Sequence, residues 1–292
     1  MLDYRVFTFI KVSETLNFTR AARELHITQP AVTKHIQSLE AEYQTKLVTF
    51  SGKQCDLTSQ GKELLDLLIT MTNDIQHFKS HLIHQSTPLN FGATLTIGEY
   101  VLSDVLVNLL SKNGNLQVKM LVDNTETLLK AIDQGQIDFA LVEGFFSKEK
   151  YDFLRYKKEP FIAVAAPQSN LNKKTVNLEE LLNYPIIIRE EGSGTRDILE
   201  LALKEANLTI ADFHNITEIG NLNTIKNLVK NHLGISFVYQ SVVEKELRNG
   251  ELITINLNNM PIFHDFTFIW RKNSHFNNQY QDVFDLFLDN KA

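Results

Sequence analysis

The 292-residue chain has almost no cysteine and no long apolar segment. Its single cysteine, Cys55, excludes an internal disulfide framework and fits a reducing compartment. No apolar run approaches the roughly 18 residues of a membrane span. The N-terminal sequence MLDYRVF lacks the basic start and apolar stretch of a signal peptide. We therefore expect a cytoplasmic protein without a membrane partner.

An excess of basic residues is also missing, because 29 Lys and Arg stand against 35 Asp and Glu, a net charge of −6. Residues 1–60 carry seven basic and six acidic side chains, a net charge of +1. Neutralisation of phosphates dominates the affinity of proteins for nucleic acid. If residues 1–60 bind DNA, one copy should bind weakly, and several copies must act together.

Two short helices with a tight turn between them are predicted in the stretch 18–43. The first has an apolar face made by Ala21, Ala22 and Leu25. The second has apolar residues at helical spacing, which are Val32, Ile36, Leu39 and Tyr43. Only three residues separate the two helices, which is typical of a helix-turn-helix. Thr28 can cap the second helix, and Pro30 fits its first turn, where a missing N–H costs little.

The polar face of the second helix is suited to reading a DNA major groove. Gln29, Thr33 and Gln37 recur at every fourth position, and Lys34 lies beside them. Gln can bond adenine, Thr can contact a base edge, and Lys can reach guanine or a phosphate. The alternative is an ordinary solvated helix face, which the tight turn and the segment that follows disfavour. The expected DNA contacts are Thr28, Gln29, Pro30, Thr33, Lys34, Gln37 and Lys53.

Two short strands are predicted directly after this helix, at 47–50 and 54–57, with Ser51-Gly52 in the turn between them. Such a hairpin beside a helix-turn-helix is a wing. Lys53 lies at its tip, where it is placed to contact phosphates or to enter the minor groove.

The segment LNFTRAARELHITQPAVTKHIQSLE resembles the DNA-binding signature of the LysR-type transcriptional regulators, and the resemblance continues to the C-terminus. It implies an α/β protein with a winged helix-turn-helix, a long dimerising helix and a two-lobed effector domain similar to periplasmic solute-binding proteins. The segments GATLTIGEY, LVEG and REEGSGTR look most like the branch that regulates sulfur-assimilation and carbon-fixation genes.

The wing departs from the pattern of this family. Its members usually carry arginine on the strand before the Ser-Gly turn, where this chain has Thr49 and Phe50. Cys55 lies in the same hairpin, and a redox-responsive regulator is an alternative hypothesis. No second cysteine is present to resolve a sulfenic acid, and no basic cluster lowers the pKa of the thiol.

A long helix is predicted from the cap Thr58 to about Ser86. Its apolar residues follow the heptad spacing of helices that pack together. The expected dimer interface is Leu64, Leu68, Met71, Ile75, Phe78 and Leu82.

From residue 89, strand and helix patterns alternate, which indicates a parallel sheet. The predicted domains are 1–58 (winged helix-turn-helix), 59–88 (linker helix), 89–161 completed by 266–292 (first effector lobe) and 162–265 (second lobe).

Two polar segments are placed to hold a ligand between the lobes. Thr94 and Thr96 follow a strand and begin a helix expected at 97–112, where backbone N–H groups favour an anion. REEGSGTR offers two glycines, two hydroxyls and a cation at another helix start. The alternative for each is a common glycine turn with a hydroxyl cap. We predict that a small anionic metabolite binds Thr94, Thr96, Ser193, Gly194, Thr195, Arg196 and Asn221, with Asn223 and Glu143-Gly144 as further wall residues.

Other classes of protein fit the sequence less well. An enzyme is disfavoured because no nucleophile and base are paired, and Ser193 lacks the GxSxG elbow. The histidine pair at 81 and 84 lacks further ligands for a metal, and no cofactor is expected. A cytoplasmic ligand-binding protein without DNA binding leaves the helix-turn-helix unexplained. We expect a dimer of dimers that bends promoter DNA and responds to the metabolite, with RNA polymerase as a possible partner.

Overall fold

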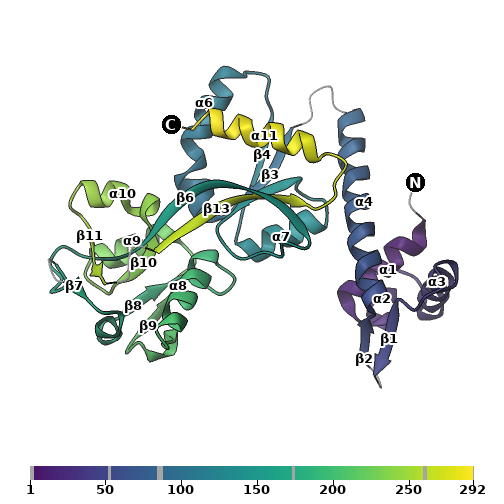
Figure 1. Cartoon of the computed structure of the whole chain (residues 1–292), viewed down its shortest axis with the longest axis horizontal. Coiled ribbons are helices and arrows are strands. Elements are labelled where there is room, and N and C mark those ends of the chain that lie inside the picture. Colours follow the sequence, from purple (N-terminus) through teal and green to yellow (C-terminus); the bar gives the residue numbers. More distant parts are fainter. Residues whose placement is uncertain (1–2, 52–53, 84–87, 173–174, 259–261, 292) are drawn as a thin grey trace. The chain divides into compact units, whose positions relative to one another are not determined.

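The computed structural model describes residues 3–51, 54–83, 88–172, 175–258 and 262–291, which form two compact units. Figure 1 shows helices α1–α4 and a small hairpin in the first unit, and a large mixed sheet with its helices in the second. The first unit consists mainly of residues up to Ile83, and the second mainly of the residues after it. None of the described helices is long and apolar enough to cross a membrane.

Three short helices and a hairpin precede the long helix α4 in the first unit. Asn17 caps α2, and Thr28 caps α3 by accepting a hydrogen bond from the N–H of Ala31 at 3.3 Å. The cap predicted for Thr28 is therefore confirmed. The hairpin strands pair antiparallel. The elements are α1 (Tyr4–Thr15), α2 (Phe18–Glu24), α3 (Gln29–Glu42), β1 (Val48–Ser51) and β2 (Gln54–Leu57).

The apolar faces of these helices meet in one core. Val32, Ile36 and Leu39 of α3 are at most 2% exposed, and they pack with Phe9 of α1. Tyr43 was predicted on the same face, and that prediction is wrong, because its side chain is 48% exposed. The reason is local: α3 ends at Glu42, so Tyr43 is the capping residue beyond the last helical turn.

Helix α4 (Ser59–Ile83) begins against the wing. The Thr58 hydroxyl accepts a hydrogen bond from the N–H of Gly61 and donates one to the Lys46 carbonyl at 2.7 Å. A Cβ atom at Gly61 would lie 2.1 Å from the Leu47 carbonyl oxygen. Only glycine allows so close an approach, so the start of α4 is fixed against the strand that follows α3.

The heptad residues of α4 divide into two groups. Leu68 is 4% exposed and Leu64 is partly buried, because both pack into the core of the first unit. Met71, Phe78 and Leu82 have 41%, 53% and 69% of their surface exposed, and Ile75 between them is partly buried. The stripe expected to face a partner helix thus narrows to the C-terminal part of α4.

The second unit is built on a seven-stranded sheet with the order β10-β6-β13-β5-β3-β4, and β11 also pairs with β6. The strands β3, β4 and β5 are parallel, while the long strands β6 and β13 run antiparallel to each other. In Figure 1 these two long strands run from one lobe into the other. Their bounds are β3 (Leu89–Ala93), β4 (Val118–Val122), β5 (Phe139–Val142), β6 (Tyr151–Ala165), β10 (Ser236–Tyr239), β11 (Ile253–Thr254) and β13 (Ile262–Arg271).

The helices of the first lobe surround β3, β4 and β5. A single helix was predicted from Ile97 to Lys112, and that prediction is wrong. The segment forms two helices, because the backbone bends at Val101 (φ −118°, ψ −45°). The helices of this lobe are α5 (Leu95–Tyr100), α6 (Leu102–Lys112), α7 (Thr125–Asp133) and α11 (Asn277–Asp289).

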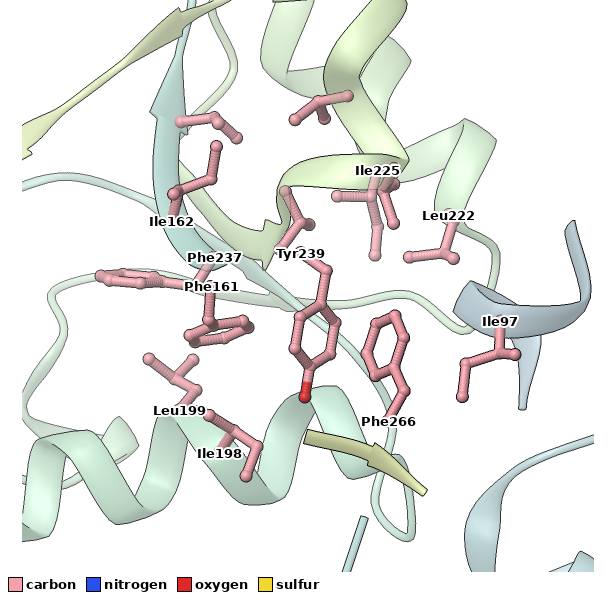
Figure 2. Packing of buried hydrophobic residues seen from close by; sticks show 14 of the residues in the cluster. Ile97, Phe161, Ile162, Ile198, Leu199, Leu222, Ile225, Phe237, Tyr239 and Phe266 are labelled. Atoms are coloured by element: carbon pink, nitrogen blue, oxygen red, sulfur yellow. The ribbon is translucent and has the colours of Figure 1, made fainter. Parts of the chain in front are cut away.

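The second lobe packs around β10 and a parallel pair, β8 and β9. Figure 2 shows Tyr239 between the rings of Phe161 and Phe266, whose centroids lie 5.2 and 4.8 Å from its own. Its elements are β8 (Ile186–Ile188), β9 (Ile216–Glu218), α8 (Gly194–Glu205), α9 (Leu222–Lys230), α10 (Gln240–Arg248), the short pair β7 (Thr175–Val176) and β12 (Asn256–Leu257), and two 3-10 turns at Leu178–Asn183 and Ile210–Asp212.

A stack of phenylalanine rings holds the first lobe together. Phe139 on β5 lies 4.5 Å from Phe268 on β13 and 5.2 Å from Phe91 on β3, between ring centroids. Phe287 of α11 meets Phe91 edge-on at 5.3 Å. The four rings are at most 2% exposed, so they join three strands and one helix in a single core.

We expect Phe268→Ala to lower the free energy of unfolding of this unit by about 3–5 kcal/mol, because it leaves a cavity among the stacked rings. Urea titration followed by the fluorescence of Trp270, the only tryptophan in the sequence, measures this. Phe263→Ala is the matched control, since Phe263 lies on the same strand and is 52% exposed. Equal losses in the two variants would contradict the assigned role of the stack.

Candidate functional sites

Helix α3 presents a polar face away from the core. Gln29, Lys34 and Gln37 are exposed, and Thr33 is partly exposed. The Gln29 amide donates a hydrogen bond to the Thr33 hydroxyl at 2.9 Å, which orders the two side chains along the helix. Side chains of this kind form hydrogen bonds with base edges in a major groove. The predicted contact Lys53 lies outside the described residues.

A buried carboxylate ties α3 to the wing. Glu40 is 8% exposed and accepts hydrogen bonds from the N–H groups of Leu47 at 3.0 Å and Val48 at 3.4 Å. Lys46 pairs with its other oxygen at 2.6 Å. This contact positions the hairpin relative to the polar face of α3. Sequence reasoning missed it, because a glutamate at the end of a helix ordinarily indicates an exposed side chain.

The wing has an apolar surface and a buried thiol. Phe50 is 60% exposed, and its ring lies 5.4 Å from that of Phe18. Cys55 is 2% exposed, and burial raises the pKa of its thiol. A buried thiol with a raised pKa is unreactive. The geometry of the wing therefore disfavours the alternative in which Cys55 senses oxidants.

Three of the predicted ligand residues meet at one carboxylate in the second unit. Thr94 follows β3 and Glu143 follows β5, so both lie at the same edge of the parallel strands. The Thr94 and Thr96 hydroxyls donate hydrogen bonds to Glu143 at 2.8 and 3.1 Å. Thr195, in the first turn of α8, donates to the same carboxylate from the second lobe at 2.9 Å.

The lobes approach each other closely beside this carboxylate. Glu143 is 1% exposed, and Gly144 follows it. A Cβ atom at Gly194 would lie 2.6 Å from the Gly144 nitrogen and 2.8 Å from Cγ of Glu143. Any larger residue at Gly194 would therefore push the lobes apart. Burial raises the pKa of Glu143, and the three hydroxyls and Arg189 oppose that rise.

Several buried polar atoms in this region lack a hydrogen-bond partner among the described residues. They are the Ser193 and Thr125 hydroxyls and Nη1 of Arg189. Thr125 lies next to Gly144, since a Cβ atom there would be 2.6 Å from its hydroxyl. Sequence reasoning missed Thr125 and Arg189. Thr125 begins α7, the helix that follows β4. Ligand sites lie at the carboxyl ends of parallel strands, so this position could have predicted Thr125 as a site residue.

Arg196 is bound to acidic residues of its own lobe. Its guanidinium contacts Glu218 at 2.6 Å, Glu200 at 2.8 Å and Glu191 at 3.7 Å. Three carboxylates surround this one cation, so the charge that was expected to face an anion is engaged within the second lobe.

Asn221 and Asn223, the other two residues predicted near the ligand, have different roles. Asn221 caps α9 by accepting a hydrogen bond from the Thr224 N–H at 2.9 Å. Asn223 accepts one from the Tyr100 hydroxyl at 3.1 Å, across the lobes. Lys226 lies 4.8 Å from the centroid of the Tyr100 ring. Asn221 thus shapes the helix, and Asn223 contacts the first lobe directly.

No group of three side chains suited to hold a metal ion occurs among the described His, Cys, Asp and Glu residues. The histidine pair at 81 and 84 lies outside the described side chains.

The two units define a class of protein. A helix-turn-helix with a wing is joined to two lobes that meet around a buried polar site, which is the construction of a ligand-responsive DNA-binding regulator. The chain belongs to the LysR family of transcriptional regulators. The family model "LysR substrate binding domain" matches residues 84–292, and "Bacterial regulatory helix-turn-helix protein, lysR family" matches residues 5–62.

Individual proteins agree with this assignment. The HTH-type transcriptional regulator CysL of Bacillus subtilis is 30% identical over 272 residues, 90% of this chain and 88% of that protein. The RuBisCO operon transcriptional regulator of Allochromatium vinosum is 25% identical and covers 90% of this chain and 88% of its own. The regulatory domain of CcmR from Synechocystis, solved with 2-PG, has a similar fold with a TM-score of 0.62, at 18% identity, over 70% of this chain and 97% of that one.

The raised pKa of Glu143 makes the stability of the second unit depend on pH. A proton on Glu143 stabilises the folded state fully below the ordinary glutamate pKa of 4.5, and this contribution is lost as the pH rises through the higher pKa of the folded state. We therefore expect Glu143→Gln to become progressively more stable relative to the wild type as the pH rises above 4.5 in urea titrations.

Glu126→Gln is the control, because Glu126 is an exposed side chain whose pKa is lowered by Lys130. Its stability should stay parallel to that of the wild type between pH 5 and pH 8. A constant difference between Glu143→Gln and the wild type over this range would show that Glu143 binds no extra proton on folding.

Proposed function

We propose that this LysR-type regulator binds promoter DNA as a dimer of dimers and that a small metabolite controls it from the site around Glu143. The convergence of Thr94, Thr96 and Thr195 on this carboxylate carries the proposal. Two of these hydroxyls come from the first lobe and one from the second. A ligand that contacts this cluster therefore interacts with both lobes at once.

The reading of DNA rests on α3. The exposed side chains of Gln29, Lys34 and Gln37 and the partly exposed Thr33 lie on the polar face of α3, and Glu40 holds the wing beside them. One unit of this kind has little excess positive charge, so it binds phosphates weakly. Pairing through the exposed apolar residues of α4 joins two reading units, and the pairing of dimers joins four. The four DNA-binding units of the dimer of dimers together span an extended promoter site. RNA polymerase is the partner that the assembly would contact there.

The metabolite acts through the contacts between the lobes. It changes DNA binding only by the difference between its affinities for two arrangements of the lobes. The Thr195–Glu143 hydrogen bond and the contact of Gly144 with Gly194 exist only when the lobes are close. A ligand that competes for the Thr195 hydroxyl weakens this arrangement, whereas one that binds beside it strengthens it.

The polar lining of the site supports a small oxygen-rich metabolite. Five hydroxyl groups surround Glu143 or lie beside it, and two of them have no hydrogen-bond partner in the part of the chain that the structure describes. Likeness to regulators of RuBisCO genes, and the fold shared with a regulatory domain solved with 2-PG, support an anion. Glu143 restricts which anions fit.

We expect Gln29→Ala to reduce discrimination between specific and scrambled DNA by about 1–3 kcal/mol, the range for one bidentate base contact. Non-specific binding should remain, because it depends on phosphates. Fluorescence anisotropy over a salt series, with the DNA upstream of the protein's own gene, measures both. Gln240→Ala is the control, since Gln240 is exposed on α10 in the second unit. Unchanged discrimination would mean that Gln29 does not read a base.

We expect Thr96→Val to weaken the response to the metabolite roughly fivefold, which corresponds to the loss of one hydrogen bond at the site. The measurement is the metabolite concentration that half-maximally changes DNA anisotropy, with a panel of small anionic metabolites. Thr217→Val is the control, because Thr217 lies on the exposed strand β9. An undiminished response would place the metabolite away from Thr96.

A further inference from the structure

Glu143 is an anion built into the place where an anionic ligand was expected. Its side chain is almost completely buried, and each of the three hydroxyls around it donates its proton to a carboxylate oxygen. A hydroxyl has one proton to donate. Thr94, Thr96 and Thr195 therefore have no proton left for a second anion while they are bonded to Glu143.

The charged and titratable groups that face Glu143 do not neutralise it. Arg189, after β8, favours the ionised carboxylate, but its guanidinium pairs with Glu190 at 2.7 Å. Tyr239, at the end of β10, is buried and interacts with the charge of Glu143. Among the described residues no basic side chain forms an ion pair with Glu143. A second full negative charge beside it would be strongly repelled.

Unused hydrogen-bonding capacity nevertheless remains next to this carboxylate. Thr125 and Ser193 are only 3% and 1% exposed. Their hydroxyls, and Nη1 of Arg189, have no hydrogen-bond partner among the described residues. Buried polar atoms are normally satisfied, and unsatisfied ones are costly. These donors suit oxyanion oxygens, and Glu143 is the acceptor among them.

We propose that the site binds a small oxyanion together with one proton, which is held between an oxygen of the anion and the carboxylate of Glu143. The inference rests on the proposed function and defines the chemical class of its metabolite: an oxyanion that keeps or acquires one proton. The proton turns a repulsion between two anions into a short O–H···O⁻ hydrogen bond. Ser193 and Thr125 donate to the remaining oxygens.

Glu143 therefore selects between oxyanions of the same shape. Inorganic phosphate at pH 8 retains one proton that it can donate to the carboxylate. Inorganic sulfate has the same tetrahedral form and retains none, so Glu143 must first take a proton from water. An amide at this position accepts or donates a hydrogen bond without carrying charge, and the selection disappears.

The test is calorimetric titration of the full chain with inorganic phosphate and with inorganic sulfate at pH 8 and constant ionic strength. We expect the wild type to bind phosphate at least about tenfold more tightly than sulfate, because like charges side by side in a buried site repel each other strongly. Glu143→Gln should bind the two anions within about twofold of each other, since that repulsion is absent. Glu244→Gln removes the same charge from the exposed face of α10 and should keep the preference of the wild type.

Three results would overturn the inference: equal binding of the two anions by the wild type, a preference that survives in Glu143→Gln, or no saturable binding of either anion by the wild type. Both anions stabilise proteins non-specifically, so only saturable binding counts. Anisotropy of promoter DNA with the wild type, with and without phosphate, separates this inference from the proposed function. A phosphate preference without any effect on DNA would leave the proton-linked site intact and refute its role in control.

Discussion

The hydrogen bonds that three threonines donate to Glu143 are the constraint on which the second unit depends. A carboxylate without partners in a protein interior is costly, and here hydroxyls from both lobes lower that cost. The Thr195 hydroxyl is available only when the lobes are close, so the energy of the buried charge and the position of the lobes are coupled. The contact of Gly144 with Gly194 makes this arrangement sterically possible.

The first unit uses the same device for a different purpose. Glu40 is buried and receives hydrogen bonds from two backbone N–H groups at the start of the wing. The recognition helix and the wing are thereby fixed as one surface, with the exposed polar residues of α3 on it. In each unit a buried glutamate forms hydrogen bonds that connect separate segments of the chain: Glu40 connects α3 to the wing, and Glu143 connects the two lobes. The residues proposed to contact DNA or the metabolite lie beside these glutamates.

The spacing of apolar and capping residues predicted local structure well, whereas the types of polar residue predicted the electrostatics of the ligand site less well. The cap at Thr28 and the buried face of Val32, Ile36 and Leu39 follow from local rules, and both are confirmed. The prediction of a single helix at 97–112 was wrong, because the apolar residues keep their helical spacing across the bend at Val101 and so give no sign of it. Hydroxyls at two helix starts pointed to an anion, but sequence patterns do not reveal that the anion is provided by Glu143 of the same chain.

The sequence by itself determined the family, the helix-turn-helix and the alternation of strands and helices, because these depend on short-range spacing that packing does not reverse. Only the tertiary structure decided the electrostatics of the site. Thr94, Glu143 and Thr195 are separated by about fifty residues each, and their meeting depends on the order of strands in the sheet and on the closeness of the lobes. The guanidinium of Arg196 pairs with Glu200 one turn further along α8, and it also pairs with Glu218 on β9, which only the tertiary structure brings close.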